Sequence, residues 1–223
     1  MKYRTDIKKL HDEIQRKLFL MLPEKWEKIY LYASIIEHFN KLQTGEMFFY
    51  YFPKGVLKKR PVNVYEVPSK FSIDEGHYFR LADDLYNTIK KLRELQIECD
   101  EKPWSNITIA IENLKYRVIY GYEDLNGAEI DNQQRRIIWS YRYLKLPYES
   151  FSRSEREIIH QYERQTKPFE SVYELPLYHK KLSKEIVTVR DIEKKYEFVT
   201  EEKIEEMKFK STHIPKSQIL STK

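Results

Sequence analysis

The residue types that most often carry out chemistry in proteins stand in no catalytic pattern in this chain. The sequence contains no GxxxxGK[ST], GxGxxG, HExxH or GxSxG motif. The single cysteine, Cys99, lies among acidic residues in IECDEK, and nearby carboxylates raise the pKa of a thiol and weaken it as a nucleophile. The six histidines lack the spacing of metal ligands. The sequence therefore predicts neither an enzyme nor a metal or cofactor site.

Two groups of acidic residues are dense enough to suggest a cation site. Asp83 and Asp84 are adjacent in a predicted helix, where their side chains diverge by about 100°, so they are interpreted as solvated helix surface. The segment EDLNGAEID (123–131) is denser, but it lacks the regular oxygen ligands and the closing glutamate of an EF-hand loop. Its two remaining interpretations are a turn with a helix cap and a negative patch for a basic partner. The acidic residues of that patch are Glu123, Asp124, Glu129 and Asp131.

Aromatic residues are concentrated in the stretch GEMFFYYF (45–52) and in the segment before it. Successive side chains of a strand point to opposite faces, so both faces of this stretch are aromatic, unlike a sheet with one wet face. In residues 25–37 the alternation predicts Trp26, Tyr30 and Tyr32 on one face. Three interpretations stay open: strand-forming residues only, a protein-binding face, or a surface on which bases stack. The aromatic residues predicted to contact a partner are Trp26, Tyr30, Tyr32, Phe48, Tyr50 and Tyr51.

Charge and composition narrow the class of protein. The chain has 40 basic and 35 acidic residues, a net charge of +5, and the two signs are closely mixed. A nucleic-acid-binding surface is usually clustered and of one sign, so no direct contact with nucleic acid is expected. No stretch approaches the roughly 20 apolar residues of a membrane helix, and the N-terminus has no apolar signal core. One cysteine requires no oxidising compartment. The expected location is the cytoplasm, away from membranes.

The hydrophobic pattern predicts elements that position these residues. Helices are predicted over residues 5–22, 72–98, 131–146 and 154–164. Strands are predicted over residues 25–37, 45–52, 62–67, 106–113 and 116–122. Capping boxes are predicted at Ser72–Glu75 and Ser154–Glu157, and Asp131 is a candidate cap.

The strands follow one another as hairpins rather than as βαβ units. This order predicts an α+β fold, with an antiparallel sheet of about five strands, helices packed on one face, and a C-terminal extension. One aromatic face of residues 45–52 would then contact the helices and the other would point outward. Residues 1–164 are predicted to form one domain, and residues 165–223 an extension of unknown role. Within it a short strand at 185–189 and a helix at 200–210 are expected.

Five segments in a fixed order carry a resemblance to a known family. They are LPEKWEKIYLYASII (22–36), GEMFFYYFPKG (45–55), WSNITIAIE (104–112), YEDL (122–125) and RRIIWSYRYL (135–144). Together they resemble the YezG-like immunity proteins of Gram-positive bacteria, over residues 7–164. The segment ENLKYR departs from the family pattern, which usually has a glycine in this turn.

The resemblance implies an antitoxin that is not an enzyme and that acts in the cytoplasm. Members of the family neutralise a cognate toxin, typically a nuclease domain at the C-terminal end of a long polymorphic toxin exported by a type VII secretion system. The aromatic residues of the hairpin and the acidic loop 123–131 would then contact a basic nuclease domain. The alternative is a nucleic-acid-binding module whose strand aromatics stack on bases. The sequence does not identify the toxin.

Overall fold

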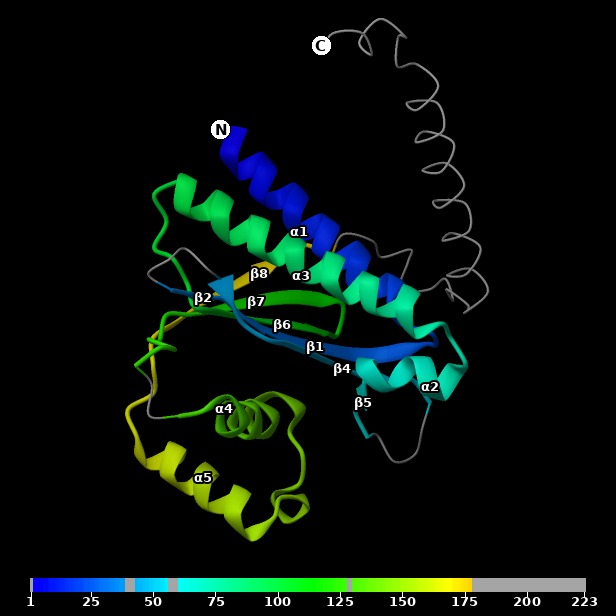
Figure 1. Ribbon diagram of the computed structural model, residues 1–223, viewed down its shortest axis with the longest axis vertical. Coiled ribbons are helices and arrows are strands. Elements are labelled where there is room, and N and C mark those ends of the chain that lie inside the picture. Colours follow the sequence, from blue (N-terminus) through cyan, green and yellow to red (C-terminus); the bar gives the residue numbers. More distant parts are fainter. Residues whose placement is uncertain (1, 39–42, 56–59, 128–129, 178–223) are drawn as a thin grey trace, which may run out of the picture. The chain divides into compact units, whose positions relative to one another are not determined.

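The computed structural model describes residues 2–38, 43–55, 60–127 and 130–177 (Figure 1). The chain divides into two compact units, Met1–Ile186 and Val187–Lys223, and every described residue belongs to the first. The strand expected at 185–189 and the helix expected at 200–210 lie outside the described residues.

A six-stranded antiparallel sheet with the order β5-β4-β1-β6-β7-β8 forms the centre of the fold. The strands are β1 (Trp26–Ser34), β4 (Met47–Pro53), β5 (Val62–Asn63), β6 (Asn106–Glu112), β7 (Lys115–Gly121) and β8 (Glu170–Leu175). A separate two-stranded ribbon contains β2 (Ile36–Glu37) and β3 (Gln43–Thr44). The α+β class and the antiparallel sheet are confirmed. Strand β8 was not expected, and it comes from the segment assigned to the C-terminal extension.

Helices cover both faces of this sheet (Figure 1). The helices α1 (Lys2–Leu20) and α3 (Glu75–Glu98) pack on one face. On the other face lie α4 (Asn132–Trp139), a π-helical turn (Ser140–Leu144) and α5 (Arg153–Arg164). The expectation that helices pack on one face only is therefore corrected. The physical reason is that strands apolar on both sides must be covered on both sides.

Contacts across the sheet show which side chains meet each helix layer. From α1, His11 Nδ1 lies 3.1 Å from the hydroxyl of Tyr116 in β7. From α4, the indole Nε1 of Trp139 donates a hydrogen bond of 3.0 Å to Thr108 Oγ1 in β6. Both contacts are buried, so each face of the sheet contributes to a hydrophobic core.

The start of α3 differs from its predicted cap. Asp74 is the N-cap, and its carboxylate accepts a hydrogen bond of 2.7 Å from the amide of His77. Ser72 instead ends the short helix α2 (Val67–Phe71) in a left-handed conformation, with φ 54°, whereas an N-cap needs an extended backbone. The strand predicted over 62–67 is likewise short, since a 3₁₀ turn begins at Val64.

The helices of the second layer start at capping boxes. Asp131 caps α4 with Gln134 as its partner, so the expected cap is confirmed. The capping box of α5 is formed by Ser152 and Glu155 and not by Ser154 and Glu157. Both pairs fit the same sequence pattern, and the observed pair begins the helix two residues earlier.

Candidate protein-binding surface

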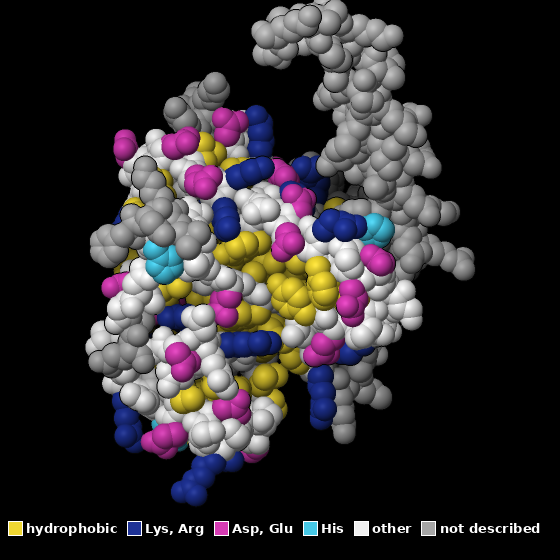
Figure 2. All heavy atoms as spheres, viewed as in Figure 1, with side chains coloured by type: hydrophobic (Ala, Val, Ile, Leu, Met, Phe, Trp, Pro, Cys, Tyr) yellow, Lys and Arg dark blue, Asp and Glu magenta, His cyan; other side chains and the backbone are white. Residues whose placement is uncertain are grey.

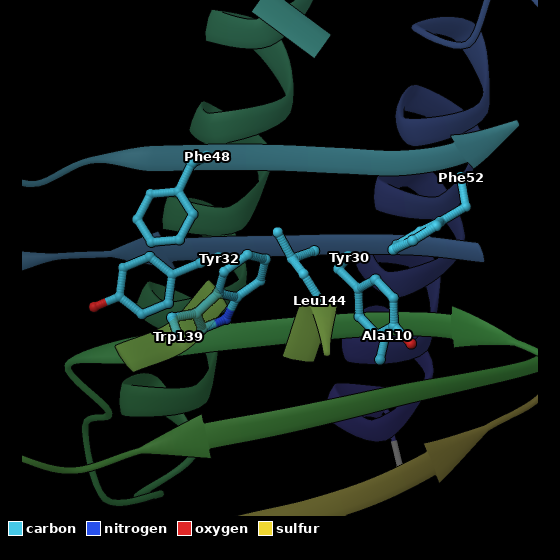
Figure 3. Packing of buried hydrophobic residues seen from close by; sticks show 7 residues of the cluster. All are labelled: Tyr30, Tyr32, Phe48, Phe52, Ala110, Trp139 and Leu144. Carbon is cyan, nitrogen blue, oxygen red and sulfur yellow. The ribbon is translucent and has the colours of Figure 1, made fainter. Parts of the chain in front are cut away.

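Tyr30, Tyr32 and Phe48 belong to a buried cluster between the sheet and the α4 layer (Figure 3). The rings of Tyr32 and Phe48 stack with centroids 4.5 Å apart. Trp139 meets the Phe48 ring edge-on at 4.9 Å. The complete cluster contains Tyr30, Tyr32, Phe48, Phe52, Ala110, Trp139 and Leu144. The aromatic face expected to point outward is thus covered by the chain itself, because Trp139 and Leu144 lie over it.

Tyr50 lies at the border of this cluster and is half-buried. Its hydroxyl accepts a hydrogen bond of 2.6 Å from Nη2 of Arg136, an exposed residue of α4. Among the predicted aromatic contacts on this face of the sheet, Tyr50 is the one that a partner can reach without moving α4. Base stacking needs exposed rings, so the burial of the other aromatics gives no support to a nucleic-acid-binding surface here.

Trp26 and Tyr51 face the opposite helix layer. The register of β1 against β4 shifts between Trp26 and Lys28, which marks a β-bulge. The extra residue turns Trp26 to the face of Tyr51, away from Tyr30, and its ring stacks on Phe19 of α1 at 5.4 Å. Tyr51 is fully buried, and its hydroxyl donates a hydrogen bond of 2.8 Å to Glu24. The predicted grouping of Trp26 with Tyr30 and Tyr32 is therefore corrected.

The acidic residues of the loop 123–131 have separate structural roles. Asp124 is exposed and accepts a hydrogen bond of 3.0 Å from the amide of Asn126, as in an Asx turn. Asp131 is exposed and caps α4. Glu123 is half-buried and accepts a hydrogen bond of 3.0 Å from Asn106 Nδ2. Glu129 lies outside the described residues. Among the described residues of this loop, the exposed carboxylates that a basic partner could meet are those of Asp124 and Asp131.

A small cavity of about 80 Å³, with both apolar and charged residues in its lining, lies between the sheet and the second helix layer. Burial raises the pKa of the Glu123 carboxyl, and the positive charge of Arg135 opposes this effect. Within the described part of the chain, Tyr32 Oη and Tyr162 Oη form no hydrogen bond with protein atoms. The charged residues of the lining are Glu123, Arg135, Arg142 and Glu170. Because these charges balance, the cavity is better suited to neutral polar groups than to an ion.

Large hydrophobic side chains are exposed at two places that sequence analysis missed. Phe169, Val172 and Tyr173 lie on or beside β8 and are 68%, 60% and 51% exposed. Tyr65 and Phe79 are 36% and 37% exposed, and their rings meet beside the N-terminal part of α3. The sequence could have indicated that Phe79 is exposed, because this residue lies beside the apolar stripe of its helix and not within it. Nothing in the spacing of Tyr65 indicated this contact.

Residues 2–38, 43–55, 60–127 and 130–177 contain no group of three or more His, Cys, Asp or Glu side chains that could hold a metal ion. Over the same residues, no helix is both long and apolar enough to span a bilayer.

Comparisons with known proteins were consistent over most of the described residues. A family model described as "Immunity protein YezG-like" matches residues 7–156. The chain is 28% identical over 138 residues to the protein named Immunity protein YezG of Bacillus spizizenii, an alignment that covers 61% of this chain and 81% of that protein. It is 27% identical over 165 residues to the Type VII secretion system protein EsaG of Staphylococcus aureus, covering 73% of this chain and 96% of that protein. The residues matched by the family model include the strands β1 to β7, the helices α3 and α4, most of α1 and only the first turn of α5.

Proposed function

The chain belongs to the YezG-like immunity protein family, and from this premise we propose that it binds and neutralises a cognate toxin in the bacterial cytoplasm. Neutralisation occurs by direct protein–protein contact and not by catalysis, so the protein is a stoichiometric inhibitor. The toxin carries a nuclease domain at its C-terminal end and is exported by a type VII secretion system. The observation that carries the proposal is the family match over residues 7–156.

The relative in Staphylococcus aureus supports the choice of secretion system, because its name assigns it to type VII secretion. A nuclease must bind a polyanion, so its substrate surface is basic. Exposed carboxylates such as those of Asp124 and Asp131 would attract that surface during diffusional encounter. The net charge of +5 argues against a protein that imitates DNA over its whole surface.

Burial divides the candidate contact residues into two groups. Tyr50, Asp124 and Asp131 are accessible and form the first contact with the toxin. Tyr30, Tyr32 and Phe48 would reach a partner only if α4 moved away from the sheet. In this proposal they do not contact the toxin, and they form the buried core against which Tyr50 packs. Residues 1–164 are proposed as the immunity domain. The extension 165–223 contributes β8 to the sheet of that domain.

A nuclease assay tests the proposal directly. The nuclease domain of the cognate toxin is mixed with increasing amounts of the protein, and cleavage of plasmid DNA is followed. We expect cleavage to fall in proportion to the protein added and to stop near equimolar amounts. A nuclease domain from an unrelated toxin is the control for specificity. Undiminished cleavage at a large molar excess would contradict the proposal.

The nucleic-acid-binding alternative is tested by filter binding of single-stranded DNA at two salt concentrations. Tight binding with a steep dependence on salt would favour it over toxin neutralisation. In the part of the chain that the structure describes, the most exposed aromatic rings at the sheet are Tyr173 of β8 and the adjacent Phe169, which do not form a row on which successive bases could stack.

A further inference from the structure

An open hollow of about 490 Å³ lies where the start of β4 meets the first half of α3. We call it the β4–α3 hollow. Its apolar lining includes Met47, Tyr65, Phe79 and Tyr86. Figure 2 shows hydrophobic side chains gathered in the middle of the viewed face, with both acidic and basic side chains around them. Exposed aromatic rings of this kind are enriched at the centres of protein interfaces.

Two carboxylates belong to the lining of the same hollow, those of Glu46 and Asp83. Oxygen Oε1 of Glu46 is buried and, among the described residues, has no hydrogen-bond partner. A buried carboxylate oxygen without a partner is unfavourable, because it has lost its hydrogen bonds to water and has formed none with the protein. Asp83 is exposed, whereas its neighbour Asp84 forms the ion pair with Lys17 of α1. No basic side chain is among the described lining residues, so the lining itself is acidic and aromatic, although Lys90 and Arg136 lie close to it.

Electrostatic effects on the tyrosines place both carboxylates close to the rings. Burial and the charge of Asp83 raise the pKa of Tyr65 to about 12, against the opposing positive charge of Arg136. Burial and the charge of Glu46 raise the pKa of Tyr86 to about 12. Burial also raises the pKa of Glu46 itself, against the opposing positive charges of Arg135 and Arg136. A cation in the hollow would therefore meet carboxylates and ring faces together.

Hydrogen bonds hold the walls of the hollow in place. The Tyr65 hydroxyl donates to the carbonyl of Met47 at 3.0 Å, and the Tyr86 hydroxyl donates to the carbonyl of Ser34 at 2.7 Å. Gly45 allows this approach, because a Cβ atom there would collide with the Ser34 carbonyl oxygen and the Tyr86 hydroxyl. The shape is thus formed before a partner arrives, which lowers the entropy lost on binding.

We propose that the β4–α3 hollow receives a lysine or arginine side chain of the protein partner, which pairs with Glu46 and Asp83 and lies against Tyr65 and Phe79. This inference rests on the proposed function, since a basic nuclease domain is the partner that would present such a side chain. Aromatic faces attract ammonium and guanidinium groups through the ring quadrupole, and a carboxylate adds a charged hydrogen bond. The chain already shows this preference nearby, where Lys90 Nζ lies 4.8 Å from the centroid of the Tyr86 ring.

Binding of the toxin nuclease domain by calorimetry tests the inference with the variants Glu46→Gln and Asp83→Asn. A charged hydrogen bond contributes about 1.5–3 kcal/mol, so we expect each variant to bind about tenfold more weakly or worse. Glu94→Gln is the matched control, because it removes one exposed carboxylate from α3 outside the hollow. Thermal unfolding of Glu46→Gln should show equal or higher stability, since the variant removes a poorly solvated charge. Weaker binding without loss of stability separates a contact role from a structural one.

A second measurement is independent of the toxin. The amide resonances of the protein are followed by NMR during titration with the peptide Gly-Arg-Gly and with its neutral analogue Gly-citrulline-Gly. We expect saturable shifts at Met47, Phe79 and Asp83 with the arginine peptide only, and their loss in Glu46→Gln. If the wild-type protein binds the nuclease and both variants bind equally well, the inference is overturned and the proposed function stands. If the wild-type protein does not bind, the proposed function fails, and equal or absent shifts with the two peptides overturn the inference separately.

Discussion

Tyr50 and Tyr51 are neighbours in β4, but their side chains enter different environments. Tyr51 is fully buried against the α1–α3 layer and its hydroxyl is bound by Glu24. Tyr50 is half-buried at the border of the α4 layer, where its hydroxyl is bound by the exposed Arg136. Truncation of Tyr51 would therefore act through stability, and only truncation of Tyr50 can report on binding. Residue type alone did not distinguish these two roles.

His11 of α1 is a buried histidine enclosed by tyrosine hydroxyls. Its Nδ1 lies 3.1 Å from Tyr116 Oη and its Nε2 lies 3.2 Å from Tyr120 Oη. Burial lowers the pKa of His11 to about 4 from the ordinary value of 6.5. Below pH 6.5 the unfolded chain therefore binds a proton at this position that the folded chain does not bind. The free energy of unfolding must fall as the pH decreases from 6.5 towards 4.

The first prediction concerns this pH dependence. At about 1.4 kcal/mol for each pH unit, His11 should lower the stability of the wild-type protein by roughly 3 kcal/mol between pH 6.5 and 4. The raised pKa values of Glu46 and Glu123 act in the opposite direction, so the comparison needs a variant. Urea denaturation across this range should give a shallower pH dependence for His11→Gln. The exposed His38→Gln is the control, and equal slopes for all three proteins would contradict the prediction.

At the scale of single elements, local chemistry identified some boundaries and missed others. Asp131 was recognised as the cap of α4 because a carboxylate before an apolar period is a strong local signal. The start of α3 was misplaced because Ser72 and Asp74 both fit that signal, and only the left-handed backbone at Ser72 decides between them. The bulge in β1 had no signal in the alternation, since it depends on pairing with β4. Local patterns therefore indicated which elements exist better than where they begin.

The second prediction separates the capping role of Asp131 from its charge. Its carboxylate accepts a hydrogen bond of 2.7 Å from the backbone N–H of Gln134. Asp131→Ala should therefore lower the free energy of unfolding by about 1 kcal/mol. Asp131→Asn should keep the stability, because asparagine caps a helix about as well as aspartate. If the carboxylate attracts the toxin, Asp131→Asn should still slow association with the nuclease domain at low salt. Unchanged association rates would remove Asp131 from the contact surface and leave it as a cap.

The third prediction concerns the turn between β6 and β7, where the expected family glycine is missing. Asn113 and Leu114 both have positive φ, 52° and 61°, which is the pattern of a type I′ turn. Asparagine tolerates this conformation, whereas leucine is strained in it by about 1–2 kcal/mol. Leu114 is 60% exposed, so little packing is lost on its removal. Leu114→Gly should therefore raise stability by about 0.5–1 kcal/mol, and a lower melting temperature than wild type would contradict this.

At the scale of the whole molecule, the class of fold was predictable but the use of the sheet faces was not. Hairpin order was enough to predict an antiparallel sheet, because consecutive strands usually pair. Trp139 and Leu144 cover Tyr32 and Phe48, although the two pairs come from distant segments of the chain. The periodicity within each segment does not predict such a contact. The β4–α3 hollow was missed for the same reason, since Glu46 and Asp83 come from different elements. An aromatic strand with two apolar faces should have suggested two helix layers.

Strand β8 forms one edge of the sheet and makes contacts on both of its faces. It lies beyond residues 7–156, which the family model matches. Glu170 accepts two hydrogen bonds from Arg142 of the π-helical turn, at 2.8 and 2.9 Å. On the other face the ring of Tyr173 meets Tyr120 edge-on at 5.7 Å. At the end of the strand Glu174 pairs with Lys115 of β7 at 3.1 Å. Removing β8 would expose the edge of β7 and leave the guanidinium of Arg142 without this partner.

The fourth prediction compares two shortened chains, one ending at Leu177 and one ending at Gln165. The longer chain keeps β8 and its contacts, whereas the shorter chain should lose at least about 2 kcal/mol, through the charged hydrogen bonds of Arg142 and the pairing of β7. Urea denaturation measures the difference, and Glu170→Gln in the full chain isolates the part that the ion pair contributes. Equal stability of the two shortened chains would show that β8 does not support the domain. If residues 1–164 alone recognise the toxin, the shorter chain should still inhibit the nuclease at temperatures where it stays folded, so a loss of inhibition there would place part of the toxin contact on β8.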